Sequence, residues 1–394
     1  MFSQGFCVFK MLKKSSKPIG RQPRFGELLP GQRKPLMAMV EITNRCNLSC
    51  PVCFSNAGHS GRDISVDKVH TYLDQLLELT DTPIPIQISG GEPTVHRGLP
   101  KIIAAAKGLG YRNIELVTNG IKISKDSEML PKLKAEGLTA VYLQFDGLKK
   151  ETYIRIRGED LTEVRQKSIA AIRNSGLCCT LAVAVARGIN DHEIGDIVRF
   201  GIDNIDVVRA INFQAATPFE GRFEIAESYN GFSMKEILHL IEAQSGVPAD
   251  TFLSEPIGHP QCNALSLVFV VDDRLMPLFK YISSGDLRSF LGKGHRRKVL
   301  DAFAGKKAFF LHHLISPKAW QLLAKAAPIF GNNPYNVLHS KHILLFAKGF
   351  MDKDALDEER INKCRYAITC EDGVFSFCAY NNLHRFARYD KKGC

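Results

Sequence analysis

The chain has 394 residues, of which 45% are hydrophobic and 24% are charged. These proportions are typical of a folded globular protein and exclude a disordered or fibrous one. The length allows one large core with a smaller appended unit. The sequence has no run of about 18 apolar residues, so it predicts no membrane-spanning helix. Because its N-terminus also lacks the order of a secretory signal, we expect a cytoplasmic protein.

The formal net charge of +11 is concentrated in two segments. Residues 1–35 hold eight Lys or Arg against Glu27, and residues 280–348 hold twelve against Asp286 and Asp301. A basic surface attracts phosphate head groups at a membrane face or nucleic acid, although a merely solvated face explains the charge equally well. Of the two partners we expect peripheral contact with anionic membrane lipid, and we do not expect nucleic acid.

Short apolar runs alternate with helical patterns from about residue 36 to 215, which is typical of parallel βα units. Strands are expected at 38–43, 86–89, 114–118, 140–145, 180–186 and 207–214. Helices are expected at 65–79, 99–109, 126–136, 161–175 and 192–201. Six such strands predict an α/β fold, a partial (β/α)6 barrel, in which chemistry gathers at the carboxyl ends of the strands.

The alternation fades beyond residue 215 into helical patches and a terminal hairpin that contains cysteines. We therefore expect a basic N-terminal arm at 1–35, the barrel at 36–215, and a C-terminal α+β region at 216–394 for substrate and an auxiliary cluster. Eleven cysteines, an odd number in a long chain, argue against a disulfide framework. The clustered cysteines are better explained as metal or iron–sulfur ligands, whereas Cys178 and Cys179 are expected in the core.

Three cysteines follow the first predicted strand with the spacing C-x3-C-x2-C: Cys46, Cys50 and Cys53. A 4Fe–4S cluster normally takes four cysteines, so a loop with three leaves one iron open to another ligand. A zinc site with a histidine such as His59 as the fourth ligand is the alternative.

At this spacing the chain resembles the radical S-adenosylmethionine (radical SAM) superfamily. The resemblance implies a 4Fe–4S cluster on the three cysteines, whose open iron binds S-adenosylmethionine. Reductive cleavage of that cofactor then gives a 5′-deoxyadenosyl radical. The resemblance also implies a reducing electron donor of the flavodoxin or ferredoxin type.

Further cofactor residues are expected where the next strands end. Glycines let a backbone approach a ligand closely and a carboxylate can meet an ammonium, and in the superfamily a Gly-Gly-Glu segment contacts the methionyl amino group. The residues that match by position are Gly90, Gly91, Glu92, Asn119, Gln144, Asp146 and Arg157. For Arg157, an exposed arginine at a helix start is the alternative.

A second group of cysteines lies in the C-terminal half, at Cys262, Cys364, Cys370 and Cys378. Four thiolates could close an auxiliary 4Fe–4S cluster for electron transfer, and a cluster with one ligand missing could bind substrate. A zinc knot or unconnected thiols would explain the same residues.

The motifs Cys-Pro-Val-Cys-Phe-Ser-Asn-Ala, Gly-Gly-Glu-Pro-Thr-Val-His, Gln-Phe-Asp-Gly, His-Pro-Gln-Cys and Phe-Cys-Ala-Tyr-Asn resemble the tetraether lipid synthase group. This resemblance implies hydrogen abstraction from an unactivated C–H bond and carbon–carbon coupling of isoprenoid lipid chains. Only Cys7 precedes Cys46, so the rubredoxin-like module of that group is not expected here. The alternatives are a maturase of a ribosomal peptide, a pterin-type methyltransferase, and a zinc-binding interaction protein without activity. We assign no catalytic residue, because hydrogen abstraction by a radical needs no general base.

Overall fold

The computed structural model describes residues 25, 34–226, 229–254, 258–291, 317–331 and 340–385. Most of the predicted N-terminal arm at 1–35 and much of the basic segment 280–348 lie outside the described residues, as do Cys7 and Cys394. Among the helices of the described part, none is long and apolar enough to cross a membrane.

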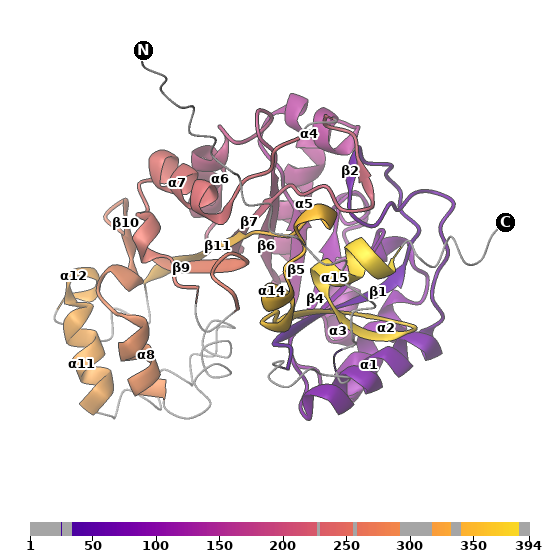
Figure 1. Cartoon of the computed structure of the whole chain (residues 1–394), viewed down its shortest axis with the longest axis horizontal. Helices are drawn as coiled ribbons and strands as arrows, with labels where there is room; N and C mark the ends of the chain where they lie inside the picture. Colours follow the sequence, from indigo (N-terminus) through magenta and orange to yellow (C-terminus); the bar gives the residue numbers. More distant parts are fainter. Residues whose placement is uncertain are drawn as a thin grey trace, which may run out of the picture.

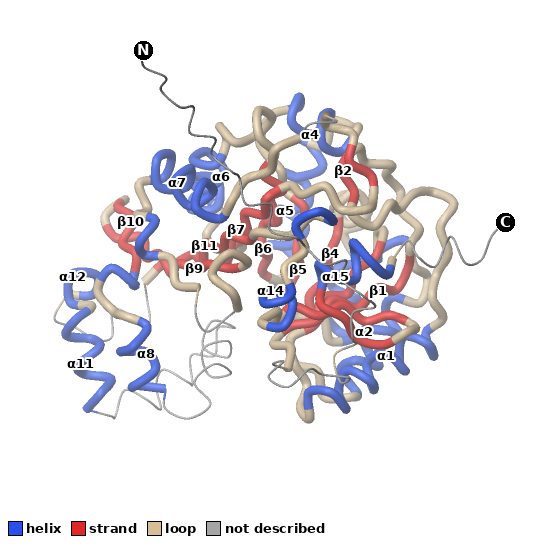
Figure 2. The backbone as a smooth tube through the Cα atoms, viewed as in Figure 1, coloured by secondary structure: helices blue, strands red, loops and turns tan. Residues whose placement is uncertain are grey.

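Six parallel strands form the centre of the fold (Figures 1 and 2). They are β1 (Met37–Thr43), β3 (Ile86–Gly90), β4 (Ile114–Thr118), β5 (Ala140–Gln144), β6 (Cys178–Val185) and β7 (Val208–Ala215). Each pairs in parallel with the next in chain order. The predicted α/β partial barrel of six βα units is confirmed.

Crossover helices join these strands, as the alternating pattern predicts. They are α1 (Val66–Thr80), α2 (Leu99–Gly108), α3 (Met129–Glu136), α4 (Lys150–Arg157), α5 (Thr162–Ser175) and α6 (Ile194–Asp203). Helix α1 begins where expected because the Ser65 hydroxyl accepts a hydrogen bond from Lys68 N at 3.3 Å, which caps the first turn. Helix α4 was not predicted, because eight residues rich in Arg and Lys carry little apolar periodicity.

C-terminal strands extend both edges of the same sheet. Strand β11 (Lys341–Lys348) pairs in parallel with β7, and β12 (Tyr366–Cys370) pairs in parallel with β1. Beyond them lie the antiparallel β9 (Asn263–Val271), β10 (Arg274–Pro277) and β13 (Gly373–Ser376). The division at residue 215 stays a prediction, but it does not coincide with an edge of the sheet.

The remaining described elements lie around this sheet. They are β2 (Val52–Cys53), β8 (Arg222–Phe223), η1 (Pro93–Val95), α7 (Met234–Ser245), η2 (Ala249–Thr251), η3 (Leu278–Lys280), α8 (Ser284–Leu291), α11 (Pro317–Lys325), α12 (Ala327–Phe330), η4 (Lys353–Ala355), α14 (Glu358–Asn362), α15 (Phe377–Ala379) and η5 (Tyr380–His384).

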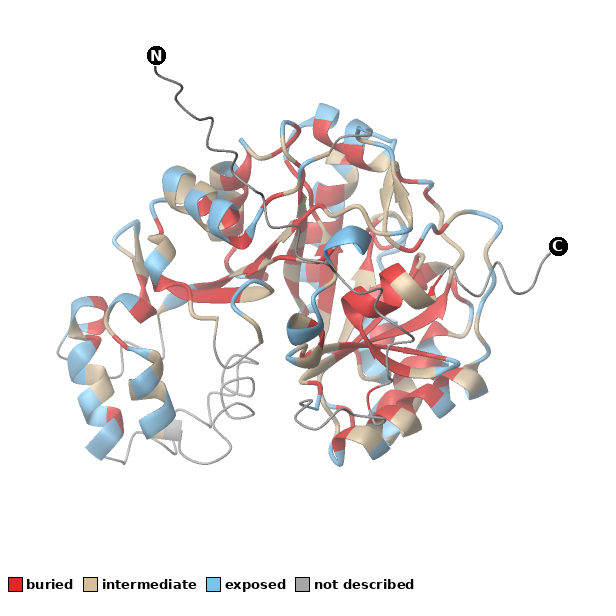
Figure 3. Ribbon diagram, viewed as in Figure 1, coloured by how far each residue is buried: buried red, intermediate tan, exposed pale blue. Residues whose placement is uncertain are grey.

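The main core lies between the helices and the outer face of the sheet (Figure 3). Outward-facing strand residues such as Val40, Ile88 and Leu116 are fully buried there, and each such side chain stabilises the fold by about 1.5–3 kcal/mol. The sheet curves so that its opposite face forms the inside of the barrel. Lys348 Nζ lies 4.5 Å from the ring centroid of Tyr366, although β11 and β12 stand at opposite ends of the run of parallel strands. The parallel strands therefore form a nearly closed barrel.

Candidate functional site

The three cysteines of the predicted cluster lie in the loop that follows β1. Cys50 is 8% exposed and the other two are partly buried. Burial is the main cause that raises the pKa of Cys46 to about 12; the charges of Glu92, Cys50 and Cys53 add to this shift, and a hydrogen bond from Leu48 N opposes it. The three sulfur atoms are thus close enough to influence one another electrostatically, and all three are free thiols.

This loop suits an iron–sulfur cluster better than a zinc ion. Within the described ranges, no three His, Cys, Asp or Glu side chains are grouped to hold a single metal ion, and a zinc site draws its ligands to within about 2.0–2.3 Å of the metal. His59, the alternative fourth ligand, is exposed, and its Nδ1 lies 3.4 Å from the Ser49 hydroxyl. The three thiols, with no histidine between them, are the ligand set of a cluster with one open iron.

Gly90 and Gly91 bring the end of β3 against the beginning of the cysteine loop. Gly91 N donates to Thr43 O at 2.8 Å, and Glu92 N donates to Arg45 O at 2.9 Å. A Cβ atom on Gly90 would lie 2.1 Å from Thr43 O, and one on Gly91 would lie 2.3 Å from Arg45 O. Both glycines are therefore required for the close approach of two backbone segments. Their predicted contact with the cofactor stays a prediction.

The carboxylate of Glu92 points into the protein. Its oxygens accept hydrogen bonds from Thr94 N at 3.1 Å, Thr94 Oγ1 at 2.6 Å, Thr118 Oγ1 at 2.8 Å and Asn119 N at 2.7 Å. The residue is 1% exposed, and burial raises the pKa of its carboxyl group. Since four protein donors occupy it, Glu92 ties η1 to the end of β4. Its predicted contact with the cofactor stays a prediction.

Asn119 connects the end of β4 to the cysteine loop. Its Nδ2 donates to Asn47 Oδ1 at 2.7 Å and lies 4.0 Å from Cys46 Sγ. Its carbonyl oxygen accepts a hydrogen bond from Arg165, whose side chain also donates to Gln144 Oε1 at 3.2 Å. The structure therefore brings Asn119 and Gln144, both predicted cofactor residues, to one edge of the barrel.

Arg165 itself was not predicted, since a helix position rich in charged neighbours looks solvated. It is 2% exposed, and its Nε is buried without a hydrogen-bond partner in the described part of the chain. No sequence signal distinguishes it from its exposed neighbours on α5.

Asp146 and Arg157 form a buried ion pair beside the same loop. Arg157 Nε and Nη2 each donate to an oxygen of Asp146 at 2.7 Å, and Nη1 donates to Val52 O at 3.2 Å. Arg157 ends α4 and its side chain is 13% exposed, so the alternative of an exposed arginine at a helix start is wrong. Burial raises the pKa of Cys50, and the positive charge of Arg157 opposes that shift. The pair thus anchors the loop between Cys50 and Cys53.

In the second cysteine group, Cys262, Cys364 and Cys378 come together. Burial raises the pKa of Cys378, and the charges of Cys364 and Cys262 raise it further. Strand β13 runs antiparallel to β12 and so returns the chain to the start of β12, where Cys364 lies. Arg360 Nε donates to Cys262 Sγ at 3.3 Å.

Cys370 lies apart from this group. It ends β12 at the turn to Gly373. Four strand steps separate it from Tyr366, which amounts to about 13 Å at roughly 3.3 Å per residue. The prediction that Cys370 joins Cys364 in one cluster is therefore not supported by the course of the strand.

A polar layer that the sequence analysis did not single out lines the inner face of the barrel. It consists of Gln87, Glu115, Tyr142, Thr180, Asn212, Gln214, Lys348 and Tyr366. Several contacts within it reach over an intervening strand, such as Thr180 Oγ1 to Glu115 Oε1 at 3.3 Å across β5 and Asn212 Nδ2 to Tyr142 OH at 2.7 Å across β6. Such contacts require one concave face. The signal in the sequence was a single polar residue within an apolar strand, as in Ile-Glu-Leu-Val-Thr.

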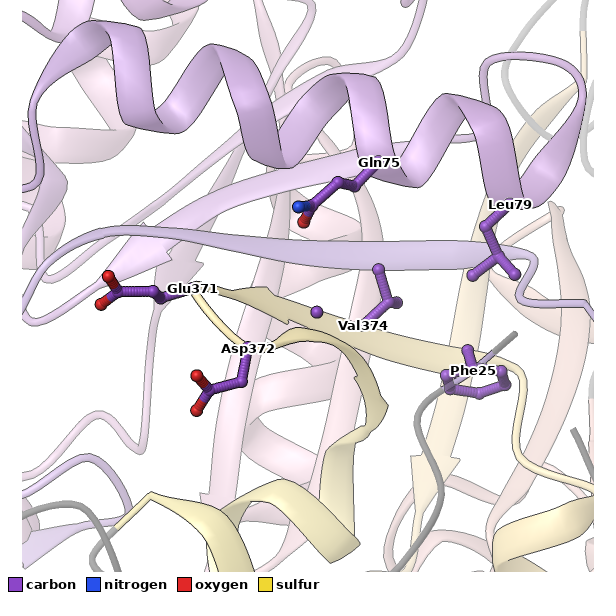
Figure 4. Close-up of a pocket in the computed structure, with 7 residues that line it drawn as sticks. Phe25, Gln75, Leu79, Glu371, Asp372 and Val374 are labelled. Atoms are coloured by element: carbon purple, nitrogen blue, oxygen red, sulfur yellow. The ribbon is translucent and has the colours of Figure 1, made fainter. Parts of the chain in front are cut away.

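A separate cavity of about 300 Å³ lies outside the barrel, between α1 and the β12–β13 hairpin (Figure 4). It is lined by Phe25, Gln75, Leu79, Glu371, Asp372, Gly373 and Val374. None of the predicted site residues lines it.

Comparison with known proteins agrees with this geometry. The model of the radical SAM superfamily matches residues 40–201. The chain is 33% identical, over 89% of its length and 77% of the relative's, to 7,8-dihydro-6-hydroxymethylpterin dimethyltransferase of Methanocaldococcus jannaschii. It is 27% identical to PqqA peptide cyclase of Bradyrhizobium diazoefficiens, over 69% of this chain and 67% of that one.

Among solved structures, SuiB of Streptococcus suis bound to S-adenosylmethionine aligns with a TM-score of 0.44 and 20% identity, over 53% of this chain and 47% of that one. The tetraether lipid synthase resemblance is not borne out by these comparisons, in which the pterin dimethyltransferase matches most of the chain. The cysteine loop, the strand-end residues and the relatives lead to one conclusion: the chain belongs to the radical SAM superfamily.

Proposed function

We propose that the protein acts on a C–H bond of a pterin-type heterocycle held inside the barrel, using a 4Fe–4S cluster and S-adenosylmethionine at the edge where Cys46, Cys50 and Cys53 lie. The superfamily uses this pair of cofactors, and its enzymes need a reducing electron donor. We expect that donor to be of the flavodoxin or ferredoxin type. Of the activities that the sequence left open, we favour the pterin-type methyltransferase.

In this proposal the cofactors generate the radical, and residues of the chain position the cysteine loop and the cofactors. When bound, the cluster would pass one electron to S-adenosylmethionine, and the cleavage of the sulfonium would release methionine and supply a 5′-deoxyadenosyl radical able to take a hydrogen atom from substrate. The glycines of the Gly90–Gly91 pair hold the loop against β3, and Arg157 ties it to Asp146. Asn119 and Gln144 lie at the edge where the adenosyl group would bind. Arg165 holds both in position through hydrogen bonds to Asn119 O and Gln144 Oε1.

The observation that carries the choice of substrate is the polar layer beneath this edge. Its side chains offer a carboxylate, an ammonium, amides and two phenols, which suit a small heterocycle with many hydrogen-bonding atoms. The relative from Methanocaldococcus jannaschii, named for a pterin substrate, matches over most of this chain. Both observations favour a pterin-type substrate.

Lipid and peptide substrates have weaker support. An isoprenoid chain would need an apolar wall, whereas the described inner face carries Glu115 and Lys348. The basic segment expected to hold lipid head groups lies partly outside the described residues, so peripheral lipid contact stays a prediction. A peptide substrate is favoured only by the relative named for peptide cyclisation, which is less similar.

We further propose that Cys262, Cys364 and Cys378 hold an auxiliary iron–sulfur cluster without Cys370. The two cysteine groups are linked through an aromatic contact, since Phe54 follows Cys53 and Phe377 precedes Cys378. The ring centroids of Phe54 and Phe377 lie 5.4 Å apart. This proximity supports a role for the second group in electron transfer to or from the first.

The test is turnover by protein that has been purified anaerobically and reconstituted with iron and sulfide. Reduced protein with S-adenosylmethionine is incubated with 6-hydroxymethyl-7,8-dihydropterin, an isoprenoid diether lipid, or no addition. We expect the pterin, and not the lipid, to increase the yield of 5′-deoxyadenosine. Stimulation by the lipid alone would contradict the proposed substrate while leaving membership of the superfamily intact.

A further inference from the structure

Two members of the polar layer, Asn212 and Lys348, have polar atoms without a hydrogen bond in the described part of the chain. Asn212 is 3% exposed and its Oδ1 has no hydrogen bond within the described part of the chain. Its Nδ2 donates a hydrogen bond to the Tyr142 hydroxyl. If the amide were flipped, the nitrogen and oxygen would exchange places, and one of the two atoms would still lack a hydrogen bond. The ammonium of Lys348 faces the Tyr366 ring and makes no hydrogen bond or ion pair to another described residue. Buried polar groups normally have partners, so the Asn212 amide indicates a further ligand, and the half-buried Lys348 ammonium has N–H donors left for it.

Glu115 lies in the same layer, and its carboxylate can accept further hydrogen bonds. Its carboxylate accepts from Gln87 Nε2 at 2.6 Å and from Thr180 Oγ1 at 3.3 Å. An ionised carboxylate has about four lone-pair sites, so about two remain for further N–H donors. Burial raises the pKa of Glu115 and lowers the pKa of Lys348 to about 8. A ligand that satisfies both charges would offset the cost of their burial.

Solvent-sized molecules reach this layer. Glu115, Thr180, Gln214 and Lys348 are half-buried, although they lie on interior strands whose other face is covered by helices. Since helices cover the other face, the exposed surface of these side chains is assigned to the inner side of the barrel. Glu115 lies on β4 and precedes Asn119, just beyond the end of that strand, by four residues, which places it about 13 Å below the cofactor edge at roughly 3.3 Å per residue. The polar layer therefore lies inside the barrel, below the edge where the cofactors would bind.

From this arrangement we infer that Glu115, Lys348 and Asn212 form a receptor for the amino-lactam edge of a bicyclic heteroaromatic ring. Such an edge has an exocyclic amine and a ring N–H side by side, and a carbonyl oxygen next to them. The two N–H groups match the free lone pairs of Glu115, and the carbonyl oxygen matches the ammonium of Lys348. The remaining atom of Asn212 would meet a further polar atom of the ring.

This inference rests on the proposed function and sharpens it, because it names the atoms of the substrate that the barrel recognises. Pterins and guanine share the amino-lactam edge, so the chemistry alone does not separate them. A ring with a carbonyl in place of the exocyclic amine would turn a lone pair toward Glu115, and repulsion would weaken its binding.

The test is a comparison of matched ligands by anaerobic calorimetry on the reconstituted full chain with S-adenosylmethionine. The pairs are 6-hydroxymethylpterin against 6-hydroxymethyllumazine, and guanosine against xanthosine, which differ at the amine position. We expect the wild type to prefer the amine member of at least one pair by about 10- to 100-fold, since hydrogen bonds to charged groups are worth that much. Whichever pair binds identifies the source of the edge.

Glu115→Gln should reverse or abolish this preference, because an amide can also donate to the carbonyl analogue. A purely structural role for Glu115 would weaken both members of a pair equally. The matched control is Glu163→Gln on α5, whose side chain is 76% exposed, and which should retain the wild-type preference. Equal affinity of the wild type for both members, or an unchanged preference in Glu115→Gln, would overturn the inference.

The same preparations separate this inference from the proposed function. Stimulation of wild-type turnover by the pterin together with an unchanged preference in Glu115→Gln would overturn the receptor alone. Glu115-dependent binding of the guanosine pair with no turnover of a pterin would support the receptor and overturn the pterin substrate. Binding of neither pair by the wild type would overturn both.

Discussion

Replacement of Gly91 by alanine tests whether close backbone contact assembles the cysteine loop. The added Cβ would lie 2.3 Å from Arg45 O and 2.7 Å from Arg45 C, so β3 and the loop must separate by about 1 Å to reach ordinary contact. Overpacking of this kind costs about 1–3 kcal/mol. Separation would also strain the two backbone hydrogen bonds from Gly91 and Glu92, worth about 1 kcal/mol each. The total destabilisation is about 3–5 kcal/mol, concentrated beside Cys46.

The assay is anaerobic reconstitution followed by iron determination, absorbance of the cluster and thermal unfolding. We expect Gly91→Ala to bind markedly less iron and to unfold at lower temperature. Gly108→Ala is the matched control, because a Cβ there meets nothing within 4 Å and the residue ends α2. The control should be as stable as the wild type or more stable by up to about 1 kcal/mol. A Gly91→Ala protein with wild-type iron content and stability would refute the close-contact reasoning.

Three further predictions concern the buried ion pair, the auxiliary cysteines and the cap of α7, and two matched control variants accompany them. Arg157→Lys should lower the free energy of unfolding by about 3 kcal/mol, because it breaks a buried bidentate ion pair. Arg173→Lys, which changes an exposed ion pair, should lower it by less than about 1 kcal/mol. Equal losses of the two variants in urea unfolding would contradict this. Cys378→Ser should reduce the iron bound per chain, and Cys370→Ser should not; the reverse order would overturn the proposed auxiliary ligands. Glu236→Gln should be less stable than the wild type at neutral pH. The pKa of Glu236 is lowered from 4.5 to about 2 by bonds to Ser233 and Arg187, so its stabilising effect should disappear as the pH falls from about 4.5 to 2. A difference independent of pH would contradict that explanation.

The strands and the cysteine loop could be predicted because their signals are local. Each parallel strand is a short apolar run bounded by turn residues, and the spacing of Cys46, Cys50 and Cys53 needs no tertiary information. Helix α1 was predicted to within a residue because Ser65 is a strong cap. By contrast, the joining of β11 and β12 to the barrel depends on pairings more than 100 residues apart in the chain, which no local pattern encodes.

The roles of individual site residues were harder to predict, because they depend on what the folded backbone places nearby. Glu92 matches the family motif, yet its carboxylate bonds to Thr94, Thr118 and Asn119. Glu115 interrupts an apolar strand, which is a signal of an inner-face position, but its neighbours come from β3 and β6. Sequence spacing thus indicated where chemistry occurs and left open which atoms take part.

The central claim is that the loop after β1 holds the cluster that cleaves S-adenosylmethionine. The most direct test is the yield of 5′-deoxyadenosine from reduced, anaerobically reconstituted wild type, Cys50→Ser and Cys178→Ser, the last being a half-buried cysteine outside the loop. We predict iron binding and cleavage in the wild type and Cys178→Ser, and loss of cleavage in Cys50→Ser. Undiminished cleavage in Cys50→Ser, or a wild type that binds zinc and yields no 5′-deoxyadenosine, would contradict it.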